Sequence, residues 1–216
     1  MALPLYALAG IADERLFDAQ RAVREIRAIR WIAPADPRET LASYAVRLAL
    51  EIDTAQPFDL GGASFGGMVA LELARHLAPR NVFLFGSCRS RHAVAQYLRV
   101  LRYIARAVPH RVWQPPRIVH PFIARWFGAT SPAHVDLFTE MLRATAPEFV
   151  RWASNAVFSW SGVAELPMPI NHIHGSGDRL IPLHRVNPDR VIAGAGHLLN
   201  LTHGEAVNDF IAGAAL

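Results

Sequence analysis

Short apolar runs alternate with longer amphipathic segments along most of the chain. The runs end at glycine, proline or polar residues, and most are apolar at successive positions. That pattern is typical of strands buried on both faces of a parallel sheet. They predict strands at 3–8, 26–32, 58–60, 82–85, 169–174 and 189–192.

Amphipathic segments fill the gaps between these strands. Apolar residues recur every three or four positions most clearly over 39–52 (ETLASYAVRLALEI), and related patterns predict helices at 13–23, 65–77 and 204–211. Asp13 can cap the helix predicted at 13–23. Alternating strands and helices predict an α/β fold, a three-layer sandwich with a mostly parallel sheet of about six strands.

The segment 89–166 breaks this alternation. It shows helical patterns, six prolines and, between Trp113 and Phe138, five aromatic residues, with no evident strand. Ligands of open α/β sheets bind beyond the carboxyl ends of the strands. We therefore expect 89–166 to be a helical lid over that edge, inserted into a core made of 1–88 and 167–216.

Composition narrows the class of protein. The chain has 216 residues, of which 52% are hydrophobic, so it suits one globular domain. No window is apolar enough for a membrane span, and the N-terminus lacks the basic region of a signal peptide. One cysteine, Cys88, excludes an internal disulfide framework and a cysteine metal cluster. We expect a cytoplasmic protein without a metal or cofactor.

The charges are unevenly distributed. All 22 basic residues are arginine, and 73–135 contains ten of them but no aspartate or glutamate. Such a zone can attract an anionic partner, and an ordinary solvated cationic face fits it equally. No nucleic-acid-binding motif accompanies it.

Four glycines surround Ser64 in the stretch 59–69 (DLGGASFGGMV). Residues 62–66 match G-x-S-x-G between a predicted strand and a predicted helix, where a sharp turn exposes a nucleophilic serine and needs glycine on either side. A chance match arises in roughly one chain in fifteen of this length. A plain turn is the alternative. A phosphate cradle is disfavoured because the chain has no P-loop motif, no G-x-G-x-x-G and no lysine.

A nucleophilic serine needs a base, and the base needs a carboxylate that orients it. Among ten histidines, His197 follows the last strand and the glycines of 194–196, and His203 is the second candidate. His172 and His174 share one face of a strand and fit a core role, without a convincing third metal ligand.

The carboxylate is found by elimination. It should follow a strand, and the end of the fourth strand lies in the acid-free window. Asp178, after the fifth strand, is therefore the candidate, although it could instead cap its turn. The order Ser64, Asp178, His197 suits a nucleophile elbow.

The oxyanion of a tetrahedral intermediate needs two N–H donors. The N–H of Phe65 is one candidate because it follows the serine. The N–H of Ile11 is the other, since Gly10 lets the loop after the first strand approach closely. That Gly10 merely starts a helix is a competing interpretation.

Together these stretches resemble the α/β-hydrolase superfamily. The matching pieces are 8–17 (LAGIADERLF), 62–67 (GASFGG), 174–182 (HGSGDRLIP) and 194–197 (GAGH), in family order. The resemblance implies an ester or thioester hydrolase with a helical lid. Departures are Ala9-Gly10 in place of His-Gly or Pro-Gly, a missing N-terminal hairpin, and a shortened or absent helix between Asp178 and His197. Serine at position 64 argues against haloalkane dehalogenation.

The expected function is hydrolysis of a small ester with an apolar group. Gly10, Trp113, Phe122 and Trp126 are the candidate substrate-binding residues, although the aromatics could equally just pack the lid. Resemblance to carrier-protein methyl-ester hydrolases suggests an acidic carrier protein at the basic lid. Acyl transfer with the same residues, or a non-catalytic binding protein on this fold, are the alternatives.

Overall fold

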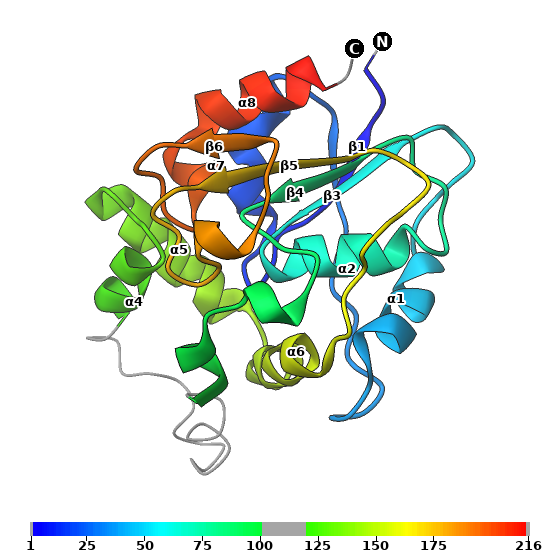
Figure 1. Ribbon diagram of the computed structural model, residues 1–216, viewed down its shortest axis with the longest axis horizontal. Helices are drawn as coiled ribbons and strands as arrows, with labels where there is room; N and C mark the ends of the chain where they lie inside the picture. Colours follow the sequence, from blue (N-terminus) through cyan, green and yellow to red (C-terminus); the bar gives the residue numbers. More distant parts are fainter. Residues whose placement is uncertain (1, 101–119, 215–216) are drawn as a thin grey trace.

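The fold is a six-stranded parallel sheet between two layers of helices (Figure 1). The computed structural model describes residues 2–100 and 120–214. The sheet order is β2-β1-β3-β4-β5-β6, and every neighbouring pair is parallel. The strands are β1 (Leu5–Leu8), β2 (Ile26–Ala28), β3 (Asp59–Ala63), β4 (Val82–Phe85), β5 (Ile170–Gly175) and β6 (Arg190–Ile192). The predicted fold class and all six strands are confirmed.

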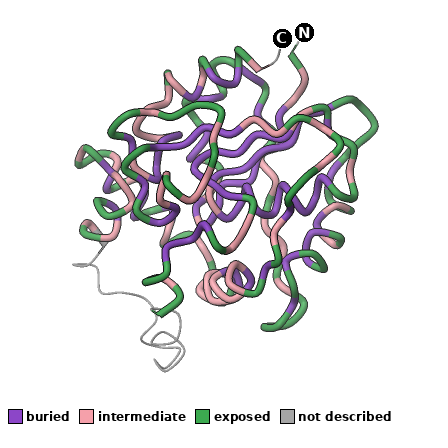
Figure 2. Tube along the Cα trace, in the orientation of Figure 1, coloured by how far each residue is buried: buried purple, intermediate pink, exposed green. Residues whose placement is uncertain are grey.

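The inner strands β1, β3 and β4 bury both of their faces, which explains their continuous runs of buried residues, whereas the edge strands β2 and β6 are partly exposed. Successive side chains point to opposite sides of a strand, so Leu84 packs with α1 (Leu41–Ala49) and α2 (Phe65–Leu73) in one core. Phe83 and Phe85 instead pack with η1 (Glu14–Ala22) and α8 (Gly204–Gly213) in a second core. Figure 2 shows the inner strands of the sheet buried along most of their length.

The predicted helices are present: η1, α1 and α2 are shorter than predicted, and α8 extends beyond its predicted end. The segment predicted at 13–23 forms a 3₁₀ helix, η1, rather than an α-helix, and Asp13 caps it by accepting a hydrogen bond from the Arg15 N–H at 3.1 Å. Thr40 caps α1 in the same way, accepting from the Ser43 N–H at 3.1 Å. A short helix, α7 (Leu199–Thr202), precedes α8.

Few residues cover the edge of the sheet at β6. Between Asp178 and His197 the only helix is η5 (Leu183–Arg185), as the shortened connection predicted. Val191 in β6 is 45% exposed. A strand of three residues gives another chain little edge to pair with.

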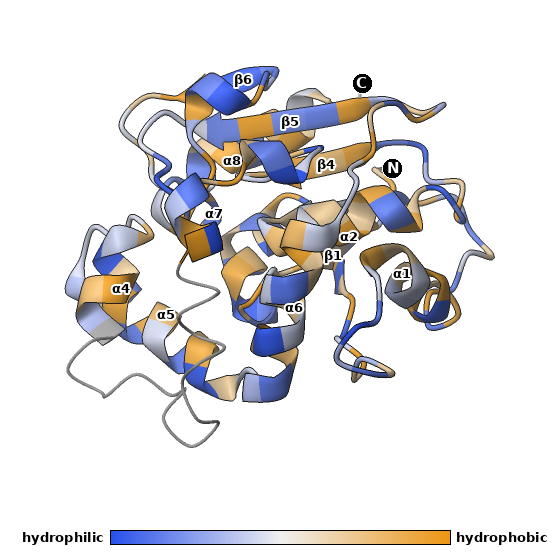
Figure 3. Ribbon diagram, turned by 60° about the horizontal axis from the view of Figure 1, so that its bottom comes forward, coloured by the Kyte–Doolittle hydropathy of each residue, from blue (hydrophilic) through white to orange (hydrophobic). Residues whose placement is uncertain are grey.

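The part of 89–166 that the structure describes contains η2 (Arg91–Ala93), α4 (His120–Trp126), α5 (Pro132–Ala144) and α6 (Pro147–Ser159), and no strand. These helices gather on one side of the sheet (Figure 3). Helix α6 packs on α2, with Phe149 and Trp152 in the core, and the Trp152 Nε1–H donates to the Glu39 carbonyl at 2.9 Å. No helix among the described residues is both long and apolar enough to cross a membrane.

Candidate active site

Ser64 occupies the sharp turn between β3 and α2. Its φ of 53° and ψ of −122° are strained for a residue with a side chain, and among the described residues it is the only non-glycine with positive φ. The Ser64 N–H donates to the Phe85 carbonyl at 3.0 Å, and the Ser87 hydroxyl donates to the Ser64 carbonyl at 2.7 Å. The neighbouring strand β4 therefore holds the turn in place.

The two flanking glycines are required by close backbone contacts. A Cβ on Gly62 would lie 2.3 Å from the backbone of Gly66, and a Cβ on Gly66 would lie 2.2 Å from the Leu8 carbonyl oxygen. The backbone of the turn thus packs against itself and against the end of β1 so closely that a side chain at either glycine would clash. This is the steric reason for the spacing found in the sequence.

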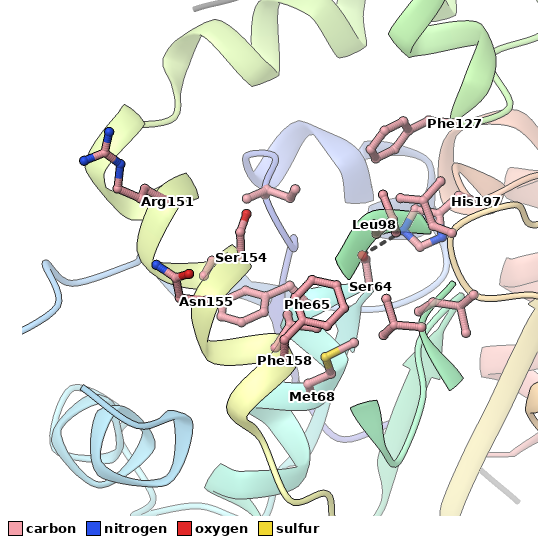
Figure 4. Close-up of a pocket in the computed structure, with 16 residues that line it drawn as sticks. Ser64, Phe65, Met68, Leu98, Phe127, Arg151, Ser154, Asn155, Phe158 and His197 are labelled. Atoms are coloured by element: carbon pink, nitrogen blue, oxygen red, sulfur yellow. Dashed lines mark hydrogen bonds between the residues drawn. The ribbon is translucent and has the colours of Figure 1, made fainter. Parts of the chain in front are cut away.

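His197 bridges Ser64 and Asp178. Its Nε2 lies 2.7 Å from the Ser64 Oγ, and its Nδ1 lies 2.7 Å from the Asp178 Oδ2 (Figure 4 draws the first contact). A carboxylate only accepts hydrogen bonds, so the proton of the neutral ring belongs on Nδ1. Nε2 is then free to accept the proton of the serine hydroxyl. All three residues follow the carboxyl ends of strands.

Asp178 is buried but held ionised. Its Oδ1 accepts hydrogen bonds from the N–H groups of Leu180 and Ile181 at 2.8 and 2.9 Å. Burial raises the pKa of the carboxyl, but the attraction of His197, its hydrogen bond and the Ile181 N–H outweigh this, and the pKa lies below its ordinary value. An ionised Asp178 keeps the His197 ring in the required tautomer.

The loop that carries His197 rests on the end of α4. A Cβ on Gly196 would lie 2.7 Å from the Gly128 Cα, and the Leu198 N–H donates to the Phe127 carbonyl at 3.1 Å. The Phe127 ring meets the imidazole edge-on, with 5.7 Å between centroids. The helical segment thus contributes to the position of the histidine.

The two candidate oxyanion donors flank Ser64. Ile11 and Phe65 both border the same cavity as the serine. Phe65 is the first residue of α2, and the first N–H groups of a helix have no partner within it. Gly10 has φ of 70°, and a Cβ there would lie 2.9 Å from the Ala63 carbonyl oxygen, so glycine lets this loop lie against the elbow.

The order of these loops and their geometry match one known family. The model of the "Alpha/beta hydrolase family" matches residues 7–210. The chain belongs to this family. No curated protein matches the sequence.

Solved structures of other proteins share the fold. An esterase from Thermogutta terrifontis is 20% identical, with 98% of this chain and 89% of that chain covered and a TM-score of 0.74. An enol-lactonase from Burkholderia xenovorans LB400 is 18% identical, with 98% and 92% covered and a TM-score of 0.74. An esterase from Exiguobacterium antarcticum is 13% identical, with 100% and 93% covered and a TM-score of 0.72. At such identities the likeness concerns the fold alone.

In this family member, Ser64 and His197 open onto a cavity of about 240 Å³. Most of its wall is apolar. The residues that line it are Ile11, Ser64, Phe65, Met68, Val94, Leu98, Phe127, Arg151, Ala153, Ser154, Asn155, Val157, Phe158, Leu180, Ile181 and His197.

The aromatic residues expected to bind substrate lie elsewhere. Phe122 is 69% exposed, and neither it nor Trp126 borders the cavity. The Trp126 Nε1–H donates to the Tyr97 hydroxyl at 3.0 Å, and the Arg179 guanidinium lies over its ring. Successive residues of a helix point about 100° apart, so α4 turns these side chains outward while the adjacent Phe127 faces the cavity. Gly10 does not border it, and Trp113 lies outside the described residues.

Sequence reasoning missed the wall that α6 provides. Arg151, Ser154, Asn155 and Phe158 stand at i, i+3, i+4 and i+7, which places them on one face of the helix. That spacing is visible in the sequence. Nothing in the sequence indicated that this polar face of α6, rather than its apolar face, would lie on the cavity at Ser64.

Three other candidate histidines, His172, His174 and His203, have different partners. The ring of His174 places Nε2 2.7 Å from the Ile181 carbonyl oxygen and 3.5 Å from the Asp178 Oδ2, and its Nδ1 lies 3.2 Å from the His172 Nε2. Burial lowers the pKa of both rings, that of His172 to about 3. This neutral pair supports the loop under Asp178. His203 contacts Thr202 at the start of α8 and is not brought to Ser64.

Proposed function

We propose that the protein hydrolyses a carboxylic ester or thioester, with Ser64 as nucleophile, His197 as general base and Asp178 as the group that orients the base. The observation that carries the proposal is the position of His197, within hydrogen-bond distance of both other side chains. The apolar cavity that opens at Ser64 supports it. Structural neighbours named as esterases and as an enol-lactonase point to the same chemistry.

The geometry of the three residues supports the following steps. The Ser64 oxygen attacks the ester carbonyl while His197 Nε2 takes the hydroxyl proton, and the N–H groups of Ile11 and Phe65 stabilise the oxyanion. His197 then protonates the leaving alcohol or thiol, which leaves an acyl-enzyme. Water, deprotonated by the same nitrogen, releases the carboxylic acid and restores Ser64.

The surroundings suggest how substrate is enclosed. In this proposal 89–166 is a lid over a core of 1–88 and 167–216, and the cavity beneath it takes the apolar part of the ester. The basic zone of 73–135 would offer a surface to an acidic carrier protein; four of its arginines (102, 106, 111 and 117) lie outside the described residues.

Two other functions use the same site. Acyl transfer to an alcohol or amine needs the same three residues, and a product analysis with competing acceptors separates it from hydrolysis. If only free acid forms, acyl transfer is rejected. A binding protein on this fold would leave the serine unreactive.

A fluorophosphonate tests the reactivity of the serine. We expect a single adduct by intact mass on wild type, none on Ser64→Ala, slow labelling of His197→Ala, and normal labelling of Ser43→Ala, whose exposed serine lies on α1. Hydrolysis of p-nitrophenyl esters of rising chain length should follow the same order. A folded wild type that acquires no adduct would reject the hydrolase and favour the binding protein.

A further inference from the structure

The polar side chains of the cavity are divided between its two sides. Ser64 and His197 lie on one side, and Arg151, Ser154 and Asn155 lie on α6 at the other (Figure 4). Figure 4 also shows apolar side chains between the two groups, namely Phe65, Met68 and Phe158. A molecule that fills the cavity therefore meets a reacting end, an apolar middle and a polar end.

The polar end is fixed in place by the opposite face of the same helix. Phe149, Trp152 and Ala156 of α6 are buried in the core, and the Trp152 indole N–H is bonded to the Glu39 carbonyl at 2.9 Å. Because that face is anchored, α6 has little freedom to rotate. The helix therefore holds residues 151, 154 and 155 at the wall of the cavity, with the Arg151 side chain extending away from Ser64 (Figure 4).

Arg151 is the cation of this wall and has no counter-ion there. No aspartate or glutamate borders the cavity among the described residues. Some arginines elsewhere in the described chain are paired with a carboxylate, among them Arg47 with Glu39 at 2.8 Å and Arg15 with Asp13 at 2.7 Å. Arg151 is half-buried, so part of its hydration is already lost and an anion placed against it would be attracted more strongly than at an open surface.

Asn155 adds a second unmet polar group. Its Oδ1 is buried and has no hydrogen-bond partner within the described part of the chain. The NH₂ of the same amide is not a buried atom of this kind, and it is the end of the side chain that can donate to a ligand in the cavity. The Ser154 hydroxyl, by contrast, already donates to the Val150 carbonyl at 2.8 Å. A bound carboxylate would give Arg151 its counter-ion and the Asn155 amide its partner.

From these observations we propose that the preferred substrates are half-esters, esters that carry a free carboxylate at the end remote from the scissile carbonyl. The carboxylate binds to the Arg151 guanidinium and the Asn155 amide, and the methylene groups between lie on Phe65, Met68 and Phe158. The proposal rests on the ester hydrolysis proposed above. A neutral alkyl ester of the same length would instead desolvate Arg151 without replacing the lost water.

Matched esters test the carboxylate site. Monoethyl esters of dicarboxylic acids are compared with ethyl esters of monocarboxylic acids of equal chain length, and acetyl esters of ω-hydroxy acids test a carboxylate on the alcohol side. At the chain length that spans the cavity, we expect wild type to have the higher kcat/KM for the half-ester. Arg151→Gln should lower the ratio of half-ester to neutral-ester kcat/KM by about 10-fold to 100-fold, mainly through KM, because a charge-assisted hydrogen bond is lost.

Controls separate this proposal from the proposed hydrolysis. Arg143→Gln removes an exposed arginine of α5 outside the cavity and should leave the ratio unchanged. Calorimetric binding of the half-ester to Ser64→Ala, with and without Arg151→Gln, tests the carboxylate site without catalysis. A wild type that prefers neutral esters at every length, or a ratio that Arg151→Gln does not change, overturns the inference while hydrolysis stands. If no ester is cleaved and Ser64 acquires no fluorophosphonate adduct, the proposed function itself fails.

Discussion

His197 places its Nε2 2.7 Å from the Ser64 hydroxyl oxygen across 133 positions of sequence. The contact depends on two different local structures, a strained strand-to-helix turn for the serine and a glycine loop resting on α4 for the histidine. Neither loop alone creates a reactive group. The parallel sheet brings them to one edge because both loops follow carboxyl ends of strands.

Asp178→Asn should nearly abolish ester hydrolysis while leaving the protein folded. An amide can donate to His197 Nδ1, which favours the tautomer that cannot accept the Ser64 proton. We expect kcat for a p-nitrophenyl ester to fall by roughly 10⁴. The matched change Asp136→Asn, on the exposed side of α5, should leave kcat within twofold. A loss of less than tenfold in Asp178→Asn would contradict the role given to the carboxylate.

Stability should fall as the pH decreases from 6.5 towards 3, and His172 should contribute to this. Burial lowers the pKa of its ring to about 3, so below pH 6.5 the unfolded chain takes up a proton that the folded protein does not. More protons on the unfolded state mean that the free energy of unfolding rises with pH. The depressed pKa of Asp178 adds a further loss only below its unfolded value of 3.8.

Urea unfolding at pH 7 and pH 5 measures the histidine effect. His172→Gln keeps a donor toward His174 but has no proton to gain, so its stability should change less between the two pH values, by an amount on the order of 1–2 kcal/mol. His184→Gln, in η5 and not buried, is the comparison. Equal pH dependence in wild type and His172→Gln would show that the ring is not held neutral.

Gly66→Ala should strongly destabilise the fold. Its Cβ would lie 2.2 Å from the Leu8 carbonyl oxygen, and the clash is with backbone that cannot move without disturbing the sheet. We expect a loss of roughly 2–4 kcal/mol in the free energy of unfolding. Gly213→Ala, at the end of α8, meets nothing within 4 Å and should be neutral or slightly stabilising. Similar melting temperatures for the two variants would contradict the crowding at the elbow.

Asp59→Asn should cost far more stability than a surface change. Asp59 and Arg24 form an ion pair in which both side chains are 2% exposed, and Asn81 donates to the same carboxylate at 2.9 Å. Neutralising one partner leaves the Arg24 charge buried and unpaired, which costs about 3–5 kcal/mol. Asp18→Asn removes an exposed partner of Arg21 and should cost less than about 1 kcal/mol. Chemical denaturation of both variants measures the two losses in the free energy of unfolding.

The sequence by itself was sufficient to predict the strands, the helices and the sharp turn at Ser64. Strands buried on both faces must be apolar at successive positions. Only glycine fits two positions before and two positions after a serine on a turn packed this closely against itself and β1. Both features can therefore be recognised from local residue types. The order of the elements then implied that Ser64, Asp178 and His197 follow strands of one parallel sheet. Their positions agree with that inference, and their catalytic roles stay predictions.

The cavity wall was decided only by the tertiary structure. Phe122 and Trp126 lie in α4 and Phe127 directly follows it, yet only Phe127 borders the cavity, because the docking of this segment against the histidine loop sets which way each side chain points. In the same way, α6 meets Ser64 with its polar face because Trp152 anchors the other face in the core. A sequence pattern shows which residues share a helix face, but the partner of that face depends on how distant segments pack.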